Sequence, residues 1–301
     1  MAPPLTGPVA RVEPQWSHHE FVDAVQPAAV MCTLNDAETL IKRGETADTY
    51  FGTEPVVITT TTMADRKLTL TSWQSEFETV EAFQPDYHIP TDVSDYEDLP
   101  AEERAERILE CMDGTLWMAN RITDAGLDID IIPLVKGKTA PERRICYKAF
   151  DRLDASMAAF YGVRYFTSGN GNQIADLYEH TEEIADEYPI NLFLIGCLKP
   201  KYLSDCADTV TAAAGQNQWR NAVKPRKQDA ETMQATYNDL ASSVRDGLDV
   251  SRLRPENMRA IPWPLLSGGS CAWCGDTTYH SHTRIFFRTR VRLPVRLKWP
   301  D

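Results

Sequence analysis

Short apolar runs and amphipathic stretches alternate along the chain. Residues 56–62 (VVITTTT) are β-branched throughout, and β-branched side chains fit a pleated, buried strand better than a helix. Residues 75–83 then place Phe77, Val80 and Phe83 on one stripe, which is the spacing of a helix with one face in the core. The pattern therefore predicts a strand followed by an amphipathic helix.

The same alternation continues through the middle of the chain. Further strands are predicted at 85–90, 129–135, 159–166 and 190–196, and a small apolar run follows at 210–214. Helices are predicted at 100–125, 141–158, 173–187, 200–210 and 225–247. Strands and helices that alternate at a spacing of roughly 30 residues indicate parallel strands joined by right-handed crossovers.

An open doubly wound sheet and a closed barrel share this pattern. No GxGxxG motif follows the first strand, which weakens a dinucleotide-binding interpretation. We expect an α/β fold, a TIM-type (β/α)8 barrel at residues 28–266. Residues 1–27, rich in proline and polar residues, are expected to be loosely ordered, and residues 267–301 form a Cys- and His-containing segment with a basic tail.

The composition is that of an acidic globular protein. Hydrophobic residues make up 43% of the chain and charged residues 25%, and the net charge is −13. Such a surface repels phosphate backbones on average, so nucleic-acid binding requires a local basic patch, which the tail at 283–298 offers. With scattered cysteines, no secretory-signal pattern and no apolar run near the ~18 residues of a membrane span, we expect a soluble cytoplasmic protein.

Four predicted strand ends share their order and spacing with one known family. They are FQPDYHIPTDVSDY, which contains Asp92, IDIIPLVKG, which ends in Lys136 and Gly137, FYGVRYFTSGNG, which contains Gly169, and INLFLIGCLKPKYL, which contains Gly196. Together these segments resemble the tRNA-guanine transglycosylase family, including its relatives that act on DNA. The resemblance implies a (β/α)8 barrel that exchanges guanine for a 7-deazaguanine through an aspartate nucleophile, with Asp92 in the role of the base-recognising carboxylate.

The chain departs from that family at two places. Residues 59–65 read TTTTMAD where the family has an Asp-Ser-Gly-Gly-Phe motif. Residues 213–220 read AAGQNQWR where the nucleophilic aspartate is expected, and they hold no carboxylate. The base-binding half of the site is therefore recognisable in the sequence, whereas the catalytic residue is unknown.

The first candidate site residues follow two adjacent predicted strands. Asp92 is expected at the carboxyl-terminal edge of a barrel, where active sites of this architecture lie, and its carboxylate can accept hydrogen bonds from a purine. The alternative is an Asx turn or a helix cap. Lys136 can bind a phosphate or a carbonyl oxygen, and Gly137 permits close backbone approach, although both also suit a solvated loop.

Two further polar clusters follow later strands, together with Gly196. Ser168, Gly169 and Asn170 belong to a glycine-rich turn that can cradle an anion or lie against a base, or that is an ordinary turn. The segment 216–220 carries amides that can bond base edges and an indole that can stack, or it simply starts a helix. Its candidate residues are Gln216, Asn217 and Trp219.

A possible metal site lies near the end of the chain. Cys271 and Cys274 have the spacing of a zinc knuckle, and His280 and His282 follow shortly after. Two thiolates and two imidazoles satisfy tetrahedral zinc, and the resembled family carries a structural zinc, although it uses three cysteines and a more distant histidine. The alternative is a pair of free thiols beside a loop.

These observations lead to one functional hypothesis and two alternatives. The chain is expected to act as a guanine or 7-deazaguanine transglycosylase-like protein on nucleic acid, either tRNA or DNA, with a purine or 7-deazapurine base as its small-molecule partner. The first alternative is a non-catalytic nucleic-acid-binding or accessory protein of the same pathway. The second is an unrelated (β/α)8 enzyme that acts on a small phosphorylated substrate, with the turn at 168–171 as the anion site.

Overall fold

The computed structural model describes residues 5–62, 68, 70–94, 99–166 and 173–248. Within these residues, eight parallel strands form one sheet in the order β5-β4-β3-β2-β1-β8-β7-β6. The strands are β1 (Gly7–Arg11), β2 (Ala29–Thr33), β3 (Val56–Thr60), β4 (Tyr87–Ile89), β5 (Asp130–Ile131), β6 (Met157–Tyr161), β7 (Asn191–Ile195) and β8 (Val210–Gly215). Because all the strands are parallel, their carboxyl-terminal ends meet at one edge of the sheet.

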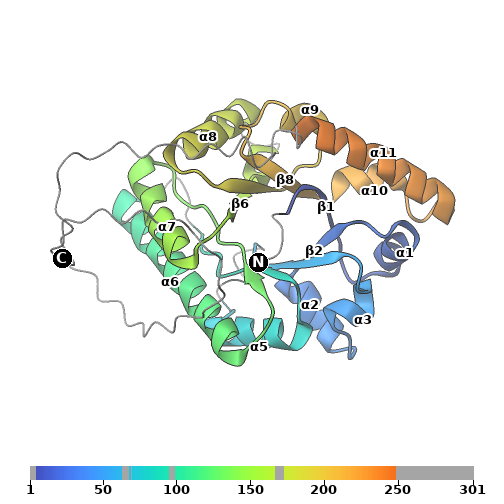
Figure 1. Cartoon of the computed structure of the whole chain (residues 1–301), viewed down its shortest axis with the longest axis horizontal. Coiled ribbons are helices and arrows are strands. Elements are labelled where there is room, and N and C mark those ends of the chain that lie inside the picture. The colour runs from blue at the N-terminus through green and yellow to red at the C-terminus, as the bar shows by residue number, and fades with distance from the viewer. Residues whose placement is uncertain (1–4, 63–67, 69, 95–98, 167–172, 249–301) are drawn as a thin grey trace, which may run out of the picture. The chain divides into compact units, whose positions relative to one another are not determined.

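Helices alternate with the strands and surround the sheet (Figure 1). They are α1 (Trp16–Val25), α2 (Leu34–Ile41), α3 (Ala47–Phe51), α5 (Trp73–Phe83), α6 (Ala101–Ala125), α7 (Ala140–Leu153), α8 (Ile174–Glu187), α9 (Pro200–Leu203), α10 (Asn217–Val223) and α11 (Ala230–Leu248), with a 3-10 helix η1 (Val163–Phe166). None of the helices in the described part of the chain combines the length and the apolar character that a membrane span requires.

The sheet is curled into a half-barrel that resembles a TIM-type barrel, so the predicted α/β class is confirmed. No continuous ladder joins β5 to β6 among the described residues, and in this respect the sheet is not a closed barrel. The two edges approach each other at one point, where Leu134 forms an isolated parallel bridge with Ala159. There the N–H of Val135 donates to the Ala159 oxygen at 2.8 Å, and the N–H of Ala159 donates to the Pro133 oxygen at 2.8 Å.

The core explains why the strands read as continuous apolar runs. Every residue of β2 and β8 is buried, because helices cover the outer face of the sheet and side chains fill its inner face. Ala212, Ala213 and Ala214 of β8 are each 0% exposed. Small residues at the centre of a strongly curved sheet leave room for the larger side chains of neighbouring strands.

The prediction that residues 1–27 are loosely ordered was wrong for residues 5–27, which the structure describes. Residues Gly7–Arg11 form β1 at the centre of the sheet, between β2 and β8, and residues Trp16–Val25 form α1. Val9 and Ala10 are fully buried, as is Phe21 of α1. Among the described prolines, Pro14 and Pro27 lie outside α1 and Pro8 is the second residue of β1, so these prolines did not prevent either element from forming.

Several element boundaries also differ from the sequence-based prediction, and the helix expected at 200–210 ends at Leu203. Helix α7 ends at Leu153 rather than at 158, because Asp154 adopts the left-handed conformation with φ of 50°. Strand β6 ends at Tyr161, and residues Val163–Phe166 form η1 instead of continuing the strand. Only Asp130–Ile131 of the run 129–135 pairs as a regular strand.

Candidate functional site

Asp92 and Lys136 lie together at the carboxyl-terminal edge of the sheet. Asp92 follows β4 and Lys136 follows β5, and these two strands are hydrogen-bonded neighbours. Lys136 Nζ donates to Asp92 Oδ1 at 2.7 Å, and the two side chains are only 10% and 12% exposed, respectively. The structure thus brings together two residues that the sequence placed separately at the ends of successive strands.

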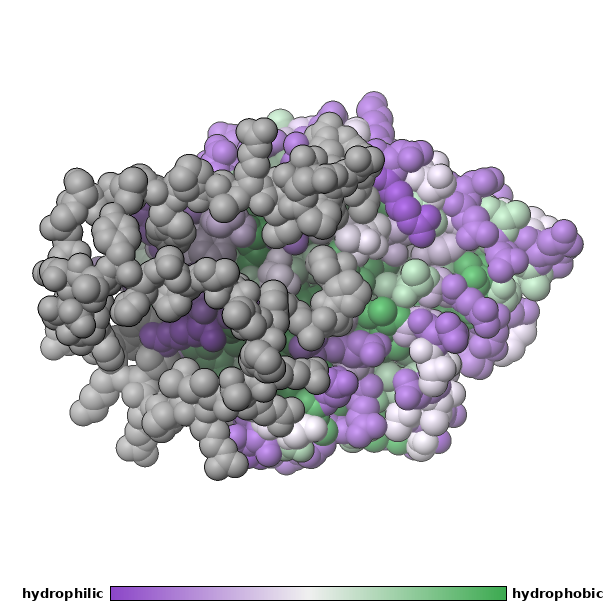
Figure 2. Space-filling model, in the orientation of Figure 1, coloured by the Kyte–Doolittle hydropathy of each residue, from purple (hydrophilic) through white to green (hydrophobic). Residues whose placement is uncertain are grey.

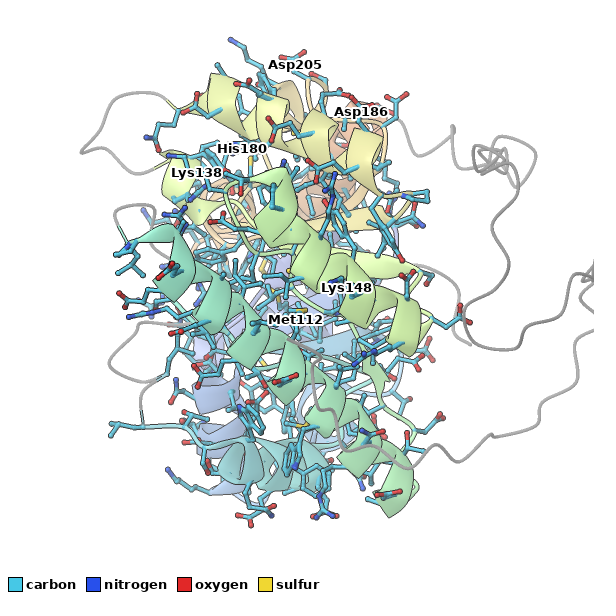
Figure 3. All side chains as sticks on the ribbon, turned by 90° about the vertical axis from the view of Figure 1, so that its left-hand side faces the viewer. Met112, Lys138, Lys148, His180, Asp186 and Asp205 are labelled. Carbon is cyan, nitrogen blue, oxygen red and sulfur yellow. The ribbon has the colours of Figure 1, made fainter. Side chains whose placement is uncertain are left out.

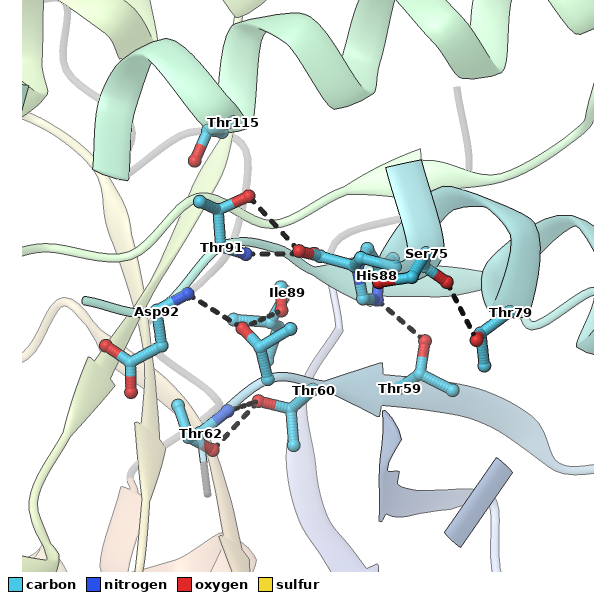
Figure 4. A network of polar contacts seen from close by, with 12 residues as sticks. Thr59, Thr60, Thr62, Ser75, Thr79, His88, Ile89, Thr91, Asp92 and Thr115 are labelled. Carbon is cyan, nitrogen blue, oxygen red and sulfur yellow. Dashed lines mark hydrogen bonds and ion pairs between the residues drawn. The ribbon is translucent and has the colours of Figure 1, made fainter. Parts of the chain in front are cut away.

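A hydrogen-bond network of threonines holds the backbone at Asp92 (Figure 4). The Asp92 N–H donates to Thr61 Oγ1 at 2.9 Å, and the Thr61 hydroxyl donates to the Ile89 carbonyl at 3.1 Å. Thr60 and Thr62 pair through their hydroxyls at 2.8 Å. The β-branched run therefore serves both as the buried strand β3 and as a set of hydroxyls that fix the start of the loop after β4.

Behind this loop, Glu76 of α5 anchors His88 and Thr91. Glu76 Oε1 lies 2.8 Å from His88 Nε2 and accepts the Thr91 N–H at 2.9 Å. On the other side of the ring, His88 Nδ1 lies 2.8 Å from Thr59 Oγ1. Glu76 is 2% exposed and His88 is 0% exposed, so these hydrogen bonds satisfy polar groups that water does not reach.

Sequence reasoning missed Glu76 and His88. One signal was available, since Glu76 lies four residues before Val80 and seven before Phe83, on the buried side of α5. A carboxylate on the buried stripe of an amphipathic helix requires a polar partner from the sheet. His88 in the middle of the short strand β4 is that partner.

The backbone at Thr91 is in the left-handed region, with φ of 48°. This conformation is costly for a β-branched residue, on the order of 1–3 kcal/mol, and persists only where surrounding contacts hold it. The Glu76 carboxylate supplies such contacts, and Gly114 of α6 leaves the necessary space. A Cβ at Gly114 would clash with Thr91 Cγ2 and would lie 2.7 Å from Trp73 Nε1.

A pocket of about 360 Å³ lies beside Asp92. Thr61, Glu76, Thr91 and Asp92 form part of its wall, and the half-buried Trp73 adds an aromatic surface. Arg107 and Glu110 of α6 also line it. The volume lies in the lower part of the range for small-molecule sites, and a few convergent polar groups beside an aromatic ring are typical of such sites.

The loop that carries Lys136 is held by a buried ion pair. Arg104 of α6 donates to Glu142 Oε1 from Nη2 at 2.7 Å, and Glu142 Oε2 accepts the N–H groups of Lys138 and Thr139 at 2.8 and 3.0 Å. Burial by itself would raise the pKa of Glu142, but the hydrogen bonds from Arg104 and the backbone outweigh it, and the pKa is lowered. The carboxylate therefore stays ionised and fixes the start of α7.

Gly137 and Gly196 are required by the local backbone. Gly137 has φ of 102°, and a Cβ there would lie 2.7 Å from Glu142 Cβ. Gly196 has φ of 117°, and a Cβ there would lie 2.5 Å from Val163 Cγ2. Close approach of the chain to itself thus accounts for both glycines, which the sequence had assigned to a ligand site.

The segment after β8 divides between surface and core. Gln216 follows the strand directly, and its buried Nε2 atom has no hydrogen-bond partner among the described residues, while Asn217 is exposed. Trp219 is 0% exposed, and its Nε1–H donates to the Arg11 carbonyl at 3.0 Å. Its ring stacks on Phe21 with centroids 4.1 Å apart, so the prediction that Trp219 stacks on a base is wrong.

Some predicted site residues lie outside the described residues. These are Ser168, Gly169, Asn170, Cys271, Cys274, His280 and His282. In the part of the chain that the structure describes, no three His, Cys, Asp or Glu side chains are grouped to hold a metal ion. From Thr209 to Gln228 the sequence contains no acidic residue, so the loop after β8 offers no carboxylate at the edge of the sheet.

The fold and the pocket together define an α/β protein with a polar, small-molecule-sized site at the carboxyl-terminal edge of a curved parallel sheet. No protein-family model matches the chain, and a search of curated proteins finds no significant match.

Proposed function

We propose that the Asp92 pocket binds a guanine or a 7-deazaguanine, and that the chain is a transglycosylase-like protein that acts on tRNA or DNA. The observation that carries the proposal is the position of Asp92. The carboxylate is largely buried at the wall of a small pocket and is bonded by Lys136, while the Asp92 N–H, just after β4, donates to Thr61.

The chemistry of the pocket fits such a base. Guanine presents a ring N–H and an exocyclic amine side by side, and a carboxylate can accept hydrogen bonds from both. Bonds to an ionised acceptor are about twice as strong as bonds between neutral groups, and they gain further strength in a site that excludes water. Trp73 offers a surface on which a flat base can stack.

The proposal includes a TIM-type (β/α)8 barrel as the framework. It is supported by the regular alternation of strands and helices and by the bridge between Leu134 and Ala159, which links the two edges of the sheet. In this framework the ends of β3, β4 and β5 contribute to one site, as is usual for the carboxyl-terminal face of such barrels.

Base exchange requires that the glycosidic bond to the outgoing base break and that the same sugar carbon bond to the incoming base. The resemblance implies a carboxylate after β8 as the nucleophile, whereas that loop carries Gln216 and Asn217. This observation favours a second candidate, a protein that binds the base in nucleic acid without exchanging it. Both candidates share the Asp92 pocket.

An exchange assay distinguishes the two candidates. Radiolabelled guanine is incubated with the full chain and with either tRNA or DNA, and acid-insoluble label is counted. A transglycosylase is expected to incorporate label, and a binding protein is expected to incorporate none while still binding guanine in calorimetry. Absence of both incorporation and binding would remove the proposed function.

A further inference from the structure

A second pocket, also about 360 Å³ in volume, lies between α1 and α10. Four cationic side chains line it, namely Arg220, Lys224, Arg226 and Lys227. Among the residues that the structure describes, no acidic side chain lines it, although the whole chain has a net charge of −13. A concentration of positive charge on an acidic protein indicates a surface that recognises an anion.

The four cations of this pocket form no salt bridge with the acidic side chains that the structure describes. None of them forms a salt bridge within the residues that the structure describes, in contrast to Arg104, Arg107, Lys136 and Arg143. Their side chains are exposed, so their charges are directed at solvent or at a ligand. The lining also includes Pro225 and three uncharged side chains that can bond phosphate oxygens, Ser17, Asn217 and Asn221.

Helix α10 fixes the arrangement of these groups. Asn217, Arg220 and Asn221 of the helix and its C-cap Lys224 occupy positions i, i+3, i+4 and i+7, which places them along one face. Trp219 and Val223 lie on the other face and are fully buried. The chain then turns through the left-handed Lys224, with φ of 47°, and leads to Arg226 and Lys227 in the same pocket.

The positive charge of the pocket also affects the pKa of the buried His18. The pKa of His18 is lowered from 6.5 to about 4, mainly because the ring is buried; Glu13 opposes this shift, and the charges of Arg220 and Arg226 contribute to it. The imidazole accepts the Glu13 N–H at Nδ1 and packs edge-on against Trp219. The ring therefore remains neutral and adds no charge of its own at neutral pH.

The geometry favours a polymer over a single phosphate. The cations are exposed and spread along a helix face and the following loop, with about 6 Å of helix rise between Arg220 and Lys224. One phosphate group does not reach all of them, whereas successive phosphates of a strand can. In the region where Figure 1 places α1, α10 and α11, the surface carries hydrophilic side chains among more apolar ones (Figure 2).

The pocket lies near the edge of the sheet that carries Asp92. Helix α10 begins two residues after the end of β8, and α1 begins five residues after the end of β1. Strands β1 and β8 are parallel neighbours in the same sheet as β4, so their carboxyl-terminal ends lie at one edge. From β1 to β4 there are three strand spacings, or about 14 Å along the sheet.

We propose that the pocket lined by Arg220, Lys224, Arg226 and Lys227 binds the phosphodiester backbone of a single-stranded nucleic-acid segment, one base of which enters the Asp92 pocket. The entry of a base into the Asp92 pocket rests on the proposed function, whereas the binding of the backbone does not. A base that reaches a buried carboxylate must leave its stack, and this requires a single-stranded or extruded nucleotide.

The test compares two double variants of the full chain. Arg220→Gln with Lys224→Gln removes two cations of the pocket, and Arg144→Gln with Lys148→Gln removes the same residue types at the same spacing from the exposed face of α7. Figure 1 places α7 and α10 on opposite sides of the sheet, and Figure 3 shows Lys148 on the α7 side. The probe is a fluorescently labelled single-stranded oligonucleotide, and anisotropy gives the Kd over a range of salt concentrations.

We expect the pocket variant to raise the Kd at least tenfold, and the control variant to change it less than twofold. The slope of log affinity against log salt should fall by about 1.4, since each lost phosphate contact on a single strand removes about 0.7. Unchanged Kd and slope would overturn the inference. So would a variant that loses affinity for inorganic phosphate but not for the oligonucleotide, since that result identifies a small-anion site.

Calorimetry with free guanine separates this inference from the proposed function. The pocket variant should bind guanine as the unmodified chain does, because its substitutions lie outside the Asp92 pocket. If the unmodified chain binds no guanine while the oligonucleotide result holds, the proposed function fails and the backbone site stands. If guanine binds and the oligonucleotide result fails, the backbone site alone is wrong.

Discussion

At the scale of single residues, the site depends on how Thr91 and Asp92 are held. Thr91 keeps a left-handed backbone, and Asp92 follows it with its N–H bonded to Thr61 and its carboxylate bonded to Lys136. Glu76 is the residue that ties this turn to the core. A buried carboxylate that accepts several hydrogen bonds contributes more to the free energy of unfolding than a surface one. Its removal leaves buried donors with neither water nor a protein partner.

Glu76→Ala tests this role. The substitution removes the acceptor for the Thr91 N–H and the partner of His88 Nε2, so we expect the free energy of unfolding to fall by about 2 kcal/mol or more. Urea denaturation provides the measurement. Glu81→Ala, at an exposed position of the same helix, is the control and should change stability by no more than about 0.5 kcal/mol. Equal effects of the two substitutions would show that the buried network does not stabilise the fold.

His18 gives the stability of the fold a defined pH dependence. Its pKa falls from 6.5 to about 4 on folding, mainly through burial, so between these values the unfolded chain binds the extra proton. The free energy of unfolding that depends on the neutral His18 ring is therefore fully present above about pH 6.5. It is lost progressively as the pH falls toward 4. Urea midpoints at pH 7 and pH 5 should differ more for the unmodified chain than for His18→Phe. The same pH dependence in both proteins would contradict the assignment.

Individual residues were predicted from the sequence with mixed success. Asp92 and Lys136 were both expected at one edge of the sheet, since parallel strands end there, but their ion pair was not predicted. Trp219 was wrongly assigned because its polar neighbours suggested a surface, whereas helix periodicity places it opposite them in the core. His88 and Glu76 were missed because their pairing joins a strand to a helix over twelve residues and depends on the fold.

At the scale of elements, α6 matters most to the site. This 25-residue helix supplies Arg107 and Glu110 to the Asp92 pocket, Arg104 to the Glu142 ion pair, and Gly114 to the space beside Thr91. A glycine in the middle of a helix costs about 1 kcal/mol relative to alanine. Its presence here is explained by the packing of α6 on Thr91 and Trp73.

Gly114→Ala separates helix propensity from packing. Propensity alone would stabilise α6, but the added methyl group meets Thr91 and Trp73, and overpacking costs roughly 1–3 kcal/mol. We expect a net loss of thermal stability and weaker binding of guanine, because the turn that carries Asp92 must shift. Asn120→Ala, at an exposed position of the same helix, is the control and should not reduce either quantity. A more stable Gly114→Ala variant with full affinity would contradict this account of the turn.

Element types were predicted more reliably than their boundaries. Residues 56–62 form a β-branched run and residues 75–83 and 173–187 were predicted as helices, and the structure has an element of the predicted type in each place. The end of α7 was misplaced because Asp154 leaves the helical conformation without a glycine or proline to mark the change. β1 was missed because Pro8 lies within it, and proline within a run argues against a strand.

At the scale of the whole molecule, the charge is strongly uneven. The chain has a net charge of −13, but all the charged side chains that line the pocket between α1 and α10, among the described residues, are cations. Repulsion from distant acids is screened beyond about 8 Å at physiological salt, so a local basic pocket can still attract a polyanion.

The α/β class followed from the strand–helix alternation, whereas the curvature of the sheet depends on side-chain volumes that the pattern does not specify.

The predicted zinc site also belongs to this scale, and its residues lie outside the part of the chain that the structure describes. If Cys271, Cys274, His280 and His282 bind zinc, elemental analysis of the purified full chain should find about one zinc per chain. Cys271→Ser with Cys274→Ser should abolish the zinc and weaken nucleic-acid binding while the far-ultraviolet circular dichroism of the helices remains. Purified protein without zinc would rule out the site.

The central claim, that Asp92 recognises a guanine-type base, is tested most directly by calorimetry. Asp92→Asn keeps the shape of the side chain but replaces an ionised acceptor by a neutral amide, so we expect the Kd for guanine or a 7-deazaguanine to rise more than tenfold, or about 1.4 kcal/mol. Asp124→Asn, at an exposed position of α6, is the matched control and should leave the Kd unchanged. Tenfold or greater weakening confined to Asp92→Asn is the result that this account predicts, and equal affinity of the unmodified chain and Asp92→Asn would contradict it.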